Sequence, residues 1–334
     1  MSRATAKVQG TTRLGHACRA ALCAVGLAGA TLWPSLAHAD SKLIVAAIGF
    51  PCGLNDFAKA LCQGFDAGKA ELPPGYSFEL KTGLDFADNN ALNDIIETSQ
   101  QLNPAGMIIF PGGAAAQVPV ARRACKAGVK IIIIDNPVVG LGECQSGYIA
   151  ADNHQLGVSL GEWLIAHPPA SKDVGIVTLQ PGQYASTDAR VKGFADTIEP
   201  AGFKVVATVS TDFSLDKTRT QVTNMLTAHP TLGAIMSAND QMGTGTAQAV
   251  RDAKIVQLTI DGSMDAVKRI PKGGLNADAT QYPYDEARLA VVNMAKLLNG
   301  EAIPPQIFTK SIVVDASNAE AYISGGGMQG LAAK

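Results

Sequence analysis

The sequence has few histidines, no long apolar run beyond its first forty residues and little surplus of either charge. After residue 40 the histidines are His154, His167 and His229, and their spacing matches no metal site. No later stretch reaches the roughly 20 apolar residues that a transmembrane helix needs. The formal net charge of −2 lacks the basic surplus that is typical of nucleic-acid binding. We therefore expect no metal, no nucleic-acid partner and no membrane-spanning segment in this part of the chain.

Residues 1–39 have the three parts of a secretory signal, namely a basic start, a short apolar core and a small-residue cleavage site. Four basic residues and no acidic residue occur in this segment, an apolar run extends over 20–33, and the triplet Ala37-His38-Ala39 follows. We expect cleavage after Ala39, so that residues 1–39 are a signal peptide and the secreted protein begins at Asp40.

Four cysteines remain after this segment: Cys52, Cys62, Cys125 and Cys144. An even number of cysteines in an oxidising compartment favours disulfide bonds. We expect the pairs that are local in sequence, Cys52–Cys62 and Cys125–Cys144. Four buried thiols are the alternative, and a metal site is disfavoured because no C-x-x-C motif or nearby histidine accompanies the cysteines.

Short apolar runs alternate with amphipathic segments along the rest of the chain. The runs are continuous, as in strands covered on both faces, and comprise 43–48, 106–110, 130–134, 174–179, 234–237 and 255–260. The amphipathic segments are 55–70, 90–102, 118–127, 154–166, 188–198, 217–228 and 243–253. Such alternation predicts βαβ units and parallel sheets. One series ends near 147–150 and a second begins near Val174, so we expect an α/β fold with two doubly wound parallel-sheet lobes.

Polar side chains follow the expected strands in a consistent way. Because ligands of open parallel sheets bind beyond the carboxyl ends of the strands, we expect these side chains to line a cleft. Carboxylates, amides and a guanidinium can each bind neighbouring hydroxyl groups, and aromatic rings can cover the C–H face of a sugar. The candidate ligand contacts that this pattern offers are Asn55, Phe57, Asp135, Asn136, Arg190, Asn239, Asp261 and Gln281.

Each of these residues also has a purely structural interpretation. An aspartate after a strand often caps the next helix. Arg190 could form a surface ion pair, and Phe57 could belong to the core. In the pair Asn239-Asp240, we expect Asn239 to contact the ligand and Asp240 to cap the following helix.

Two motifs suggest enzymes but lie in the wrong context. Gly157-Val-Ser159-Leu-Gly161 fits the G-x-S-x-G pattern, whose serine belongs on a sharp turn between a strand and a helix. Ser159 instead falls within an amphipathic segment, so we expect it inside a helix. Gly243-Thr-Gly245 lacks the third glycine of a dinucleotide loop. We therefore expect neither catalysis nor a cofactor.

Several stretches, taken in their order along 43–314, resemble a known family. They are Gly106-Met-Ile-Ile-Phe110, Ala127-Gly-Val-Lys-Ile-Ile-Ile-Ile-Asp135, Ala151-Asp-Asn153, Ala189-Arg190-Val-Lys-Gly193-Phe194, Ala238-Asn-Asp240, Ile260-Asp-Gly262 and Gln281-Tyr-Pro283. In these stretches the chain resembles the ribose-binding-protein-like, type I periplasmic binding proteins of bacterial ABC sugar importers.

The resemblance implies a periplasmic protein with two lobes and a three-crossing hinge. The N-terminal lobe would comprise 40–150 plus 283–312, and the C-terminal lobe 151–282 plus 313–334, with crossings near 151–152, 281–283 and 313–315. By position, the resemblance also implies ligand contacts at every candidate residue given above except Asn136. It adds a ninth candidate, Phe213, which could otherwise belong to the core. The sequence departs from the family at Ala58, where a second aromatic residue is common, and at Asn136, where an arginine is common.

The expected function is therefore non-catalytic binding of a monosaccharide, deoxy sugar or polyol by a monomer that delivers it to an ABC importer. The alternative is a sensor subunit that presents its liganded form to a chemoreceptor or membrane kinase. A secreted hydrolase that uses Ser159 and a sugar-responsive repressor remain as further alternatives. The repressor would need a DNA-binding motif in the segment where the signal peptide is expected.

Overall fold

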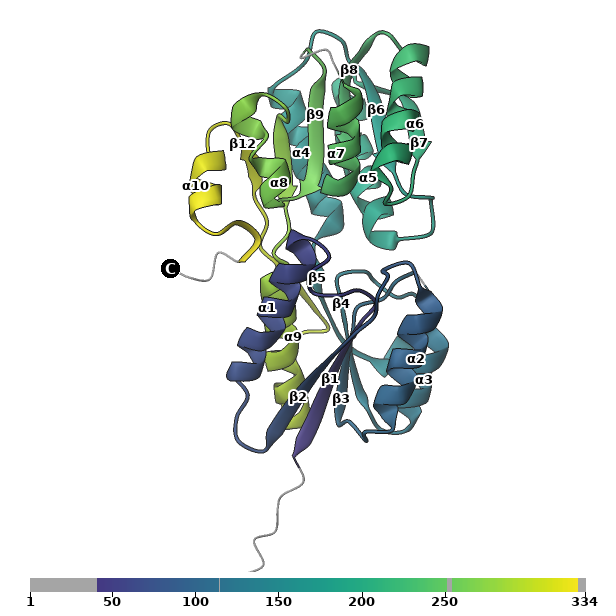
Figure 1. Cartoon of the computed structure of the whole chain (residues 1–334), viewed down its shortest axis with the longest axis vertical. Coiled ribbons are helices and arrows are strands. Elements are labelled where there is room, and N and C mark those ends of the chain that lie inside the picture. Colours follow the sequence, from purple (N-terminus) through teal and green to yellow (C-terminus); the bar gives the residue numbers. More distant parts are fainter. Residues whose placement is uncertain (1–40, 114, 251–253, 330–334) are drawn as a thin grey trace, which may run out of the picture. The chain divides into compact units, whose positions relative to one another are not determined.

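Two six-stranded sheets organise the computed structural model of the protein (Figure 1). The structure describes residues 41–113, 115–250 and 254–329. These residues belong to one compact unit. The expected signal peptide lies outside the described residues. Within the described ranges, no helix is both long enough and apolar enough to cross a bilayer.

The first sheet is entirely parallel. Its order is β11-β5-β4-β3-β1-β2, formed by β1 (Lys42–Ile48), β2 (Tyr76–Thr82), β3 (Gly106–Ile109), β4 (Lys130–Ile134), β5 (Gln145–Ala151) and β11 (Gln306–Thr309). Helices α1 (Asp56–Ala70) and α9 (Pro283–Leu298) cover one face, where Phe65 and Met294 pack on Ile108. Helices α2 (Asn89–Gln100) and α3 (Val118–Lys126) cover the other face.

The second sheet repeats this plan with one antiparallel edge. Its order is β12-β10-β9-β8-β6-β7, formed by β6 (Asp173–Thr178), β7 (Lys204–Ser210), β8 (Leu232–Ser237), β9 (Val256–Asp261), β10 (Ala277–Thr280) and β12 (Val313–Asp315). Helices α4 (Asn153–Ala166) and α5 (Ala185–Ile198) cover one face, and α6 (Leu215–Ala228) and α7 (Asp240–Ala249) the other. The short helices α8 (Met264–Val267) and α10 (Ala319–Ser324) pack beside β12. Only β12 runs antiparallel to its neighbour in this sheet, among the described strands.

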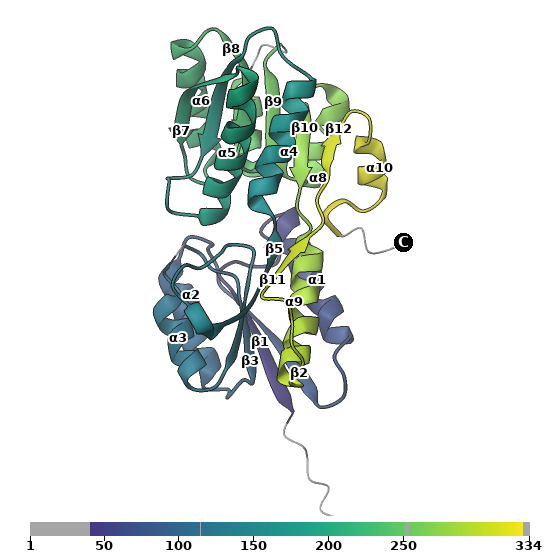
Figure 2. The same ribbon diagram turned by 180° about the vertical axis from the view of Figure 1, so that it is seen from behind.

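The chain passes between the two sheets three times (Figure 2). The passages lie between β5 and α4, between β10 and α9, and between β11 and β12. Two hydrogen bonds tie them together: the Glu286 carboxylate accepts from the Ala151 backbone N–H at 3.0 Å, and Thr280 Oγ1 accepts from that of Ile312 at 3.1 Å. The fold class expected from the sequence, two doubly wound parallel-sheet lobes with a three-crossing hinge, is confirmed.

Several elements differ from the sequence-based expectation. Strands β2, β5, β7, β11 and β12 and helices α8, α9 and α10 were not among the expected elements. Of these strands, β2 and β7 lie at sheet edges and have mixed burial, so they lack the continuous apolar run used to identify strands. Helix α5 begins at Ala185 rather than at 188, which places Arg190 in its second turn.

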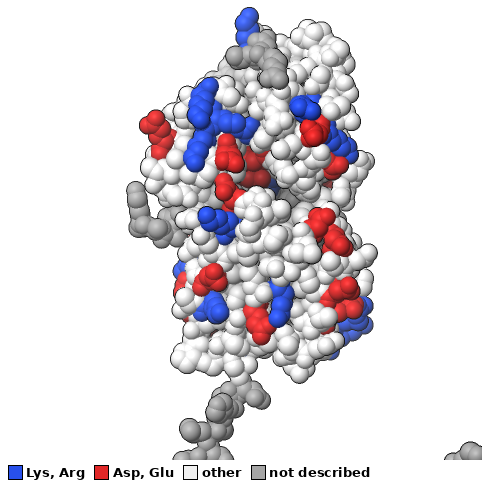
Figure 3. Space-filling model, in the orientation of Figure 1, with Lys and Arg blue, Asp and Glu red and all other residues white. Residues whose placement is uncertain are grey.

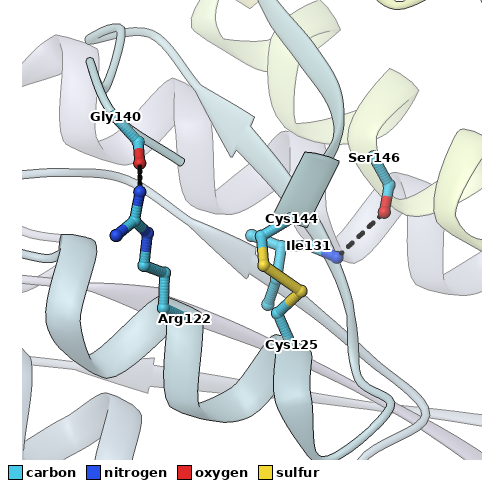
Figure 4. The surroundings of a disulfide bond; sticks show 6 residues. All are labelled: Arg122, Cys125, Ile131, Gly140, Cys144 and Ser146. Carbon is cyan, nitrogen blue, oxygen red and sulfur yellow. Dashed lines mark hydrogen bonds between the residues drawn. A yellow bond between two sulfur atoms is a disulfide. The ribbon is translucent and has the colours of Figure 1, made fainter. Parts of the chain in front are cut away.

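The two expected disulfide bonds are confirmed. Cys52–Cys62 links the loop before α1 to that helix, with the Cα atoms 5.8 Å apart. Cys125–Cys144 links the end of α3 to the residue that precedes β5, with the Cα atoms 5.6 Å apart (Figure 4). Beside it, Ser146 Oγ accepts a hydrogen bond from the Ile131 backbone N–H at 3.3 Å.

Candidate ligand-binding cleft

A cavity of about 230 Å³ lies where the carboxyl ends of both sheets meet. Residues that follow strands of the first sheet line one side, and residues that follow strands of the second sheet line the other. The structure brings eight of the nine candidate residues to this cavity, namely Asn55, Phe57, Asp135, Arg190, Phe213, Asn239, Asp261 and Gln281. Its volume lies below the roughly 300–1,000 Å³ of pockets for drug-sized ligands, so it suits a compact solute.

An ordered polar array forms the wall on the side of the second sheet. The Arg190 side chain is only 5% exposed, which excludes the surface ion pair considered from the sequence. Its Nη1 donates to Asp261 Oδ1 at 3.1 Å and to the Ala238 carbonyl at 2.9 Å. Gln281 Nε2 donates to the same Asp261 oxygen at 2.6 Å. Burial raises the pKa of Asp261, and the neighbouring guanidinium opposes that rise.

Close packing of α4 against α5 holds Arg190 in place. A Cβ at Gly157 would lie 2.0 Å from the Arg190 carbonyl oxygen, so only glycine allows this approach. Arg190 Nε then donates to Asn153 Oδ1 at 2.7 Å. The glycines of the G-x-S-x-G pattern therefore serve helix packing, and Ser159 lies inside α4 as expected.

Asp135 presents a carboxylate to the cavity from the opposite side. It is 7% exposed, and no described residue donates a hydrogen bond to its side chain. Its backbone has a left-handed φ of 59°, which is uncommon outside glycine, and the Tyr148 hydroxyl donates to its carbonyl oxygen at 2.6 Å. Burial raises the pKa of Asp135 to about 7; Arg190 lowers it and Asp261 raises it further. The Asp135 carboxylate caps no described helix.

Asn55 and Asn239 each cap a helix and also line the cavity. Each precedes a helix in an extended conformation and caps it, with Oδ1 accepting from Ala58 N and Met242 N, both at 2.9 Å. The expectation that Asp240 caps α7 is therefore wrong, because Asp240 already has helical geometry as the first residue of α7. Its carboxylate instead accepts from the Ser263 backbone N–H at 2.7 Å.

Six aromatic rings line the remainder of the cavity: Phe50, Phe57, Phe86, Phe110, Tyr184 and Phe213. Phe86 stacks on Tyr184 with ring centroids 5.4 Å apart and meets Phe213 edge to face at 5.3 Å. Phe50, Phe86 and Phe110 were not identified from the sequence. Phe50 and Phe110 follow β1 and β3, whose apolar runs were recognised, as Asp135 follows β4, and that shared position was the signal that could have found these two rings.

Asn136 is the candidate residue that does not line the cavity. It is buried, and its Oδ1 accepts a hydrogen bond from the Ser186 backbone N–H at 3.4 Å. This bond joins the loop after β4 to the first turn of α5. Among the described residues, no group of three or more His, Cys, Asp or Glu side chains is arranged to hold a metal.

Two α/β halves that share one cavity at their strand ends define the architecture of a solute-binding protein. Comparison with known proteins identifies the family: residues 47–302 match the periplasmic binding protein domain. The chain belongs to this family, and its fold is that of the type I members.

Curated relatives cover most of the chain. The D-ribose/D-allose-binding protein of Pseudomonas aeruginosa is 29% identical over 232 residues, which are 64% of this chain and 72% of that protein. The D-apiose import binding protein of Actinobacillus succinogenes is 28% identical over 311 residues, which are 90% of this chain and 96% of that protein. A solved structure described as a periplasmic ribose ABC transporter from Conexibacter woesei superposes with a TM-score of 0.76 at 22% identity, covering 86% of this chain and 95% of that one.

Proposed function

We propose that the protein binds a small hydroxylated solute, such as a monosaccharide, deoxy sugar or polyol, and delivers it to an ABC importer. The observation that carries the proposal is the convergence of Asp135, Arg190 and Asp261 on one cavity between the two sheets. The family membership and the sugar-binding relatives support it.

The proposed contacts divide between fixed and available groups. Arg190, Asp261 and Gln281 are fixed by mutual hydrogen bonds, so they can meet ligand hydroxyls without further ordering. Asn55 and Asn239 each use Oδ1 for a cap, which leaves the Nδ2 amide for a ligand oxygen. Each hydrogen bond to a charged group contributes about 1.5–3 kcal/mol, so a few of them give micromolar affinity, about −8 kcal/mol.

Ligand capture is proposed to close two lobes over the cavity. The lobes are 40–150 plus 283–312 and 151–282 plus 313–334, and the three passages between the sheets form the hinge. The ligand touches both lobes at once, so it stabilises the closed arrangement over the open one. A permease that recognises the closed form would then accept only loaded protein.

The proposed function also implies where the protein is located and which partners it has. The protein would be a periplasmic monomer, secreted through cleavage after Ala39, and it would carry out no catalysis. Acidic and basic side chains are interspersed over the face in Figure 3, which offers no broad basic area to nucleic acid. A relative named as an import binding protein favours transport over the sensor alternative.

Isothermal titration calorimetry against a panel of pentoses, hexoses and polyols tests this function. We expect at least one compound to bind with micromolar or tighter affinity. Arg190→Ala should abolish that binding, whereas Arg288→Ala should not, because the Arg288 side chain pairs with Glu71 outside the cavity. Absence of binding across the whole panel would contradict the proposal.

A further inference from the structure

The cavity contains a carboxyl group that no described side chain of this protein pairs with by direct contact. Asp135 faces the cavity, is more than nine-tenths buried, and receives no side-chain hydrogen bond from the described residues. A buried carboxylate without a partner loses several kcal/mol of solvation. The rise of the Asp135 pKa towards neutrality has the same origin. A ligand group must therefore supply the hydrogen-bond donor or positive charge that the protein does not place beside Asp135.

The cavity's positive charge is already engaged elsewhere. Arg190 is the one basic side chain among the described lining residues, and it forms its ion pair with Asp261 at 3.1 Å. The third acidic lining residue is Asp85, which lies between Leu84 and Phe86 in the loop after β2. Behind the wall, burial raises the pKa of the Glu286 carboxyl well above its usual value, and the nearby Asp135 raises it further. Among the described lining residues, the acidic groups thus outnumber the basic one.

The aromatic lining adds to this preference. A positive charge near the face of a phenyl or phenol ring is attracted by the ring quadrupole, by about 0.5–2 kcal/mol. Six rings line the cavity, and Phe57 and Phe110 belong to the same side as Asp135. Neutral hydroxyls gain nothing comparable from these rings. Carboxylate and rings together favour a compact cation.

We propose that the solute carries an amino group in addition to its hydroxyls, as an amino sugar or an amino polyol does, and that its ammonium group pairs with Asp135. The hydroxyls would meet the amides of Asn55, Asn239 and Gln281. This inference rests on the proposed function and narrows its ligand class. A neutral sugar could donate two hydroxyl hydrogens to Asp135, but it would leave the buried negative charge uncompensated.

Calorimetry with matched compounds separates the two ligand classes. Each pair differs by an amine in place of one hydroxyl: D-glucose with D-glucosamine, D-galactose with D-galactosamine, and D-glucitol with D-glucamine. We expect at least one amine to bind ten-fold or more tightly than its hydroxyl partner. Asp135→Asn should reduce that ratio towards one, whereas Asp66→Asn, at an exposed position of α1 outside the cavity, should retain it. A melting curve reports whether each variant is folded.

The outcomes distinguish this inference from the broader function. If neutral sugars bind and no amine exceeds its partner, the amino ligand is excluded and the solute-binding function stands. If the preference survives Asp135→Asn, or falls equally in Asp66→Asn, the assignment to Asp135 is wrong. If neither class binds, the proposed function itself fails.

Discussion

The Asp56 carboxylate accepts a hydrogen bond from the Met264 backbone N–H at 3.1 Å and so joins the two halves of the protein. Asp56 begins α1 beside the first sheet, and Met264 begins α8 beside the second. Neither residue lines the cavity. The contact therefore exists only while the halves are close together, and it stabilises that arrangement without touching a ligand.

Replacing Asp56 should weaken ligand binding from outside the cavity. Loss of this hydrogen bond removes about 1 kcal/mol from the closed arrangement, so Asp56→Ala should raise the ligand Kd about five-fold in calorimetry. Asp88→Ala is the matched control, because Asp88 caps α2 within one half through the Ala91 backbone N–H. That control should lower stability by about 1 kcal/mol and leave the Kd unchanged. Equal effects on Kd would contradict a closing role for Asp56.

Phe86 should contribute to ligand affinity because its ring contacts aromatic rings from both halves of the protein. It packs on Phe50 and Phe110 from its own half and on Tyr184 and Phe213 from the other. An aromatic pair contributes about 0.5–1.5 kcal/mol, so Phe86→Ala should weaken binding roughly ten-fold or more, and Phe86→Leu by less. Phe308→Ala, at a half-exposed ring on β11, should leave the Kd unchanged. If the Phe86→Ala variant matches that control, Phe86 is only a filler of the cavity wall.

The sequence predicted those parts of the site that depend on strand ends alone. Asp135 follows β4 and Asp261 is the last residue of β9, and both strands are largely buried, so the position of these carboxylates at the edge of a parallel sheet could be inferred directly. Phe86 could not be found in this way. It follows β2, an edge strand whose partly exposed side chains break the apolar run.

Other details depend on backbone conformation and close packing, which the sequence does not display. Asn239 has φ −155° and ψ 168°, the extended geometry of a cap, whereas Asp240 is already helical. Asn136 was expected in the cavity with Asp135, but its side chain accepts a hydrogen bond from the Ser186 backbone N–H instead. Helix α9 was not expected because Pro283, its first residue, was assigned only to a hinge crossing.

The two disulfide bonds should have different effects on binding. Their loops span 10 and 19 residues, so removing either should cost about 3 kcal/mol in the free energy of unfolding, measured by chemical denaturation. The double change Cys52→Ser with Cys62→Ser should also weaken ligand binding, because Cys52 precedes Asn55 and anchors the lining loop. The change of Cys125 and Cys144 to Ser should leave the Kd unaltered, since neither α3 nor the segment Gly142–Cys144 before β5 contributes a residue to the cavity lining. A shift in Kd for the second pair would show that affinity follows overall stability.

The unliganded protein should be less stable at pH 8 than at pH 5, because of Asp135. Its pKa rises to about 7 in the folded protein, mainly through burial, against an ordinary value of 3.8. The folded state therefore holds a proton that the unfolded chain has lost, and stability falls as the pH rises from about 4 to about 7. Asp240 has the same raised pKa of about 7 and acts in the same direction. Asp135→Asn removes the charge, so it should stabilise the unliganded protein at pH 8 by on the order of 1–3 kcal/mol.

Denaturation curves at pH 5, 6, 7 and 8 without ligand measure this effect. Asp135→Asn should flatten the fall in stability only in part, since the contribution of Asp240 persists. Asp212→Asn is the control: a backbone N–H from Ser214 lowers the pKa of this exposed carboxyl, so its stabilising contribution is lost only below that range. The plot of unfolding free energy against pH for this control should therefore run parallel to that of the unchanged protein from pH 5 to 8. If Asp135→Asn also runs parallel, the Asp135 carboxylate is compensated within the fold, and the unpaired charge that distinguishes this cavity does not exist.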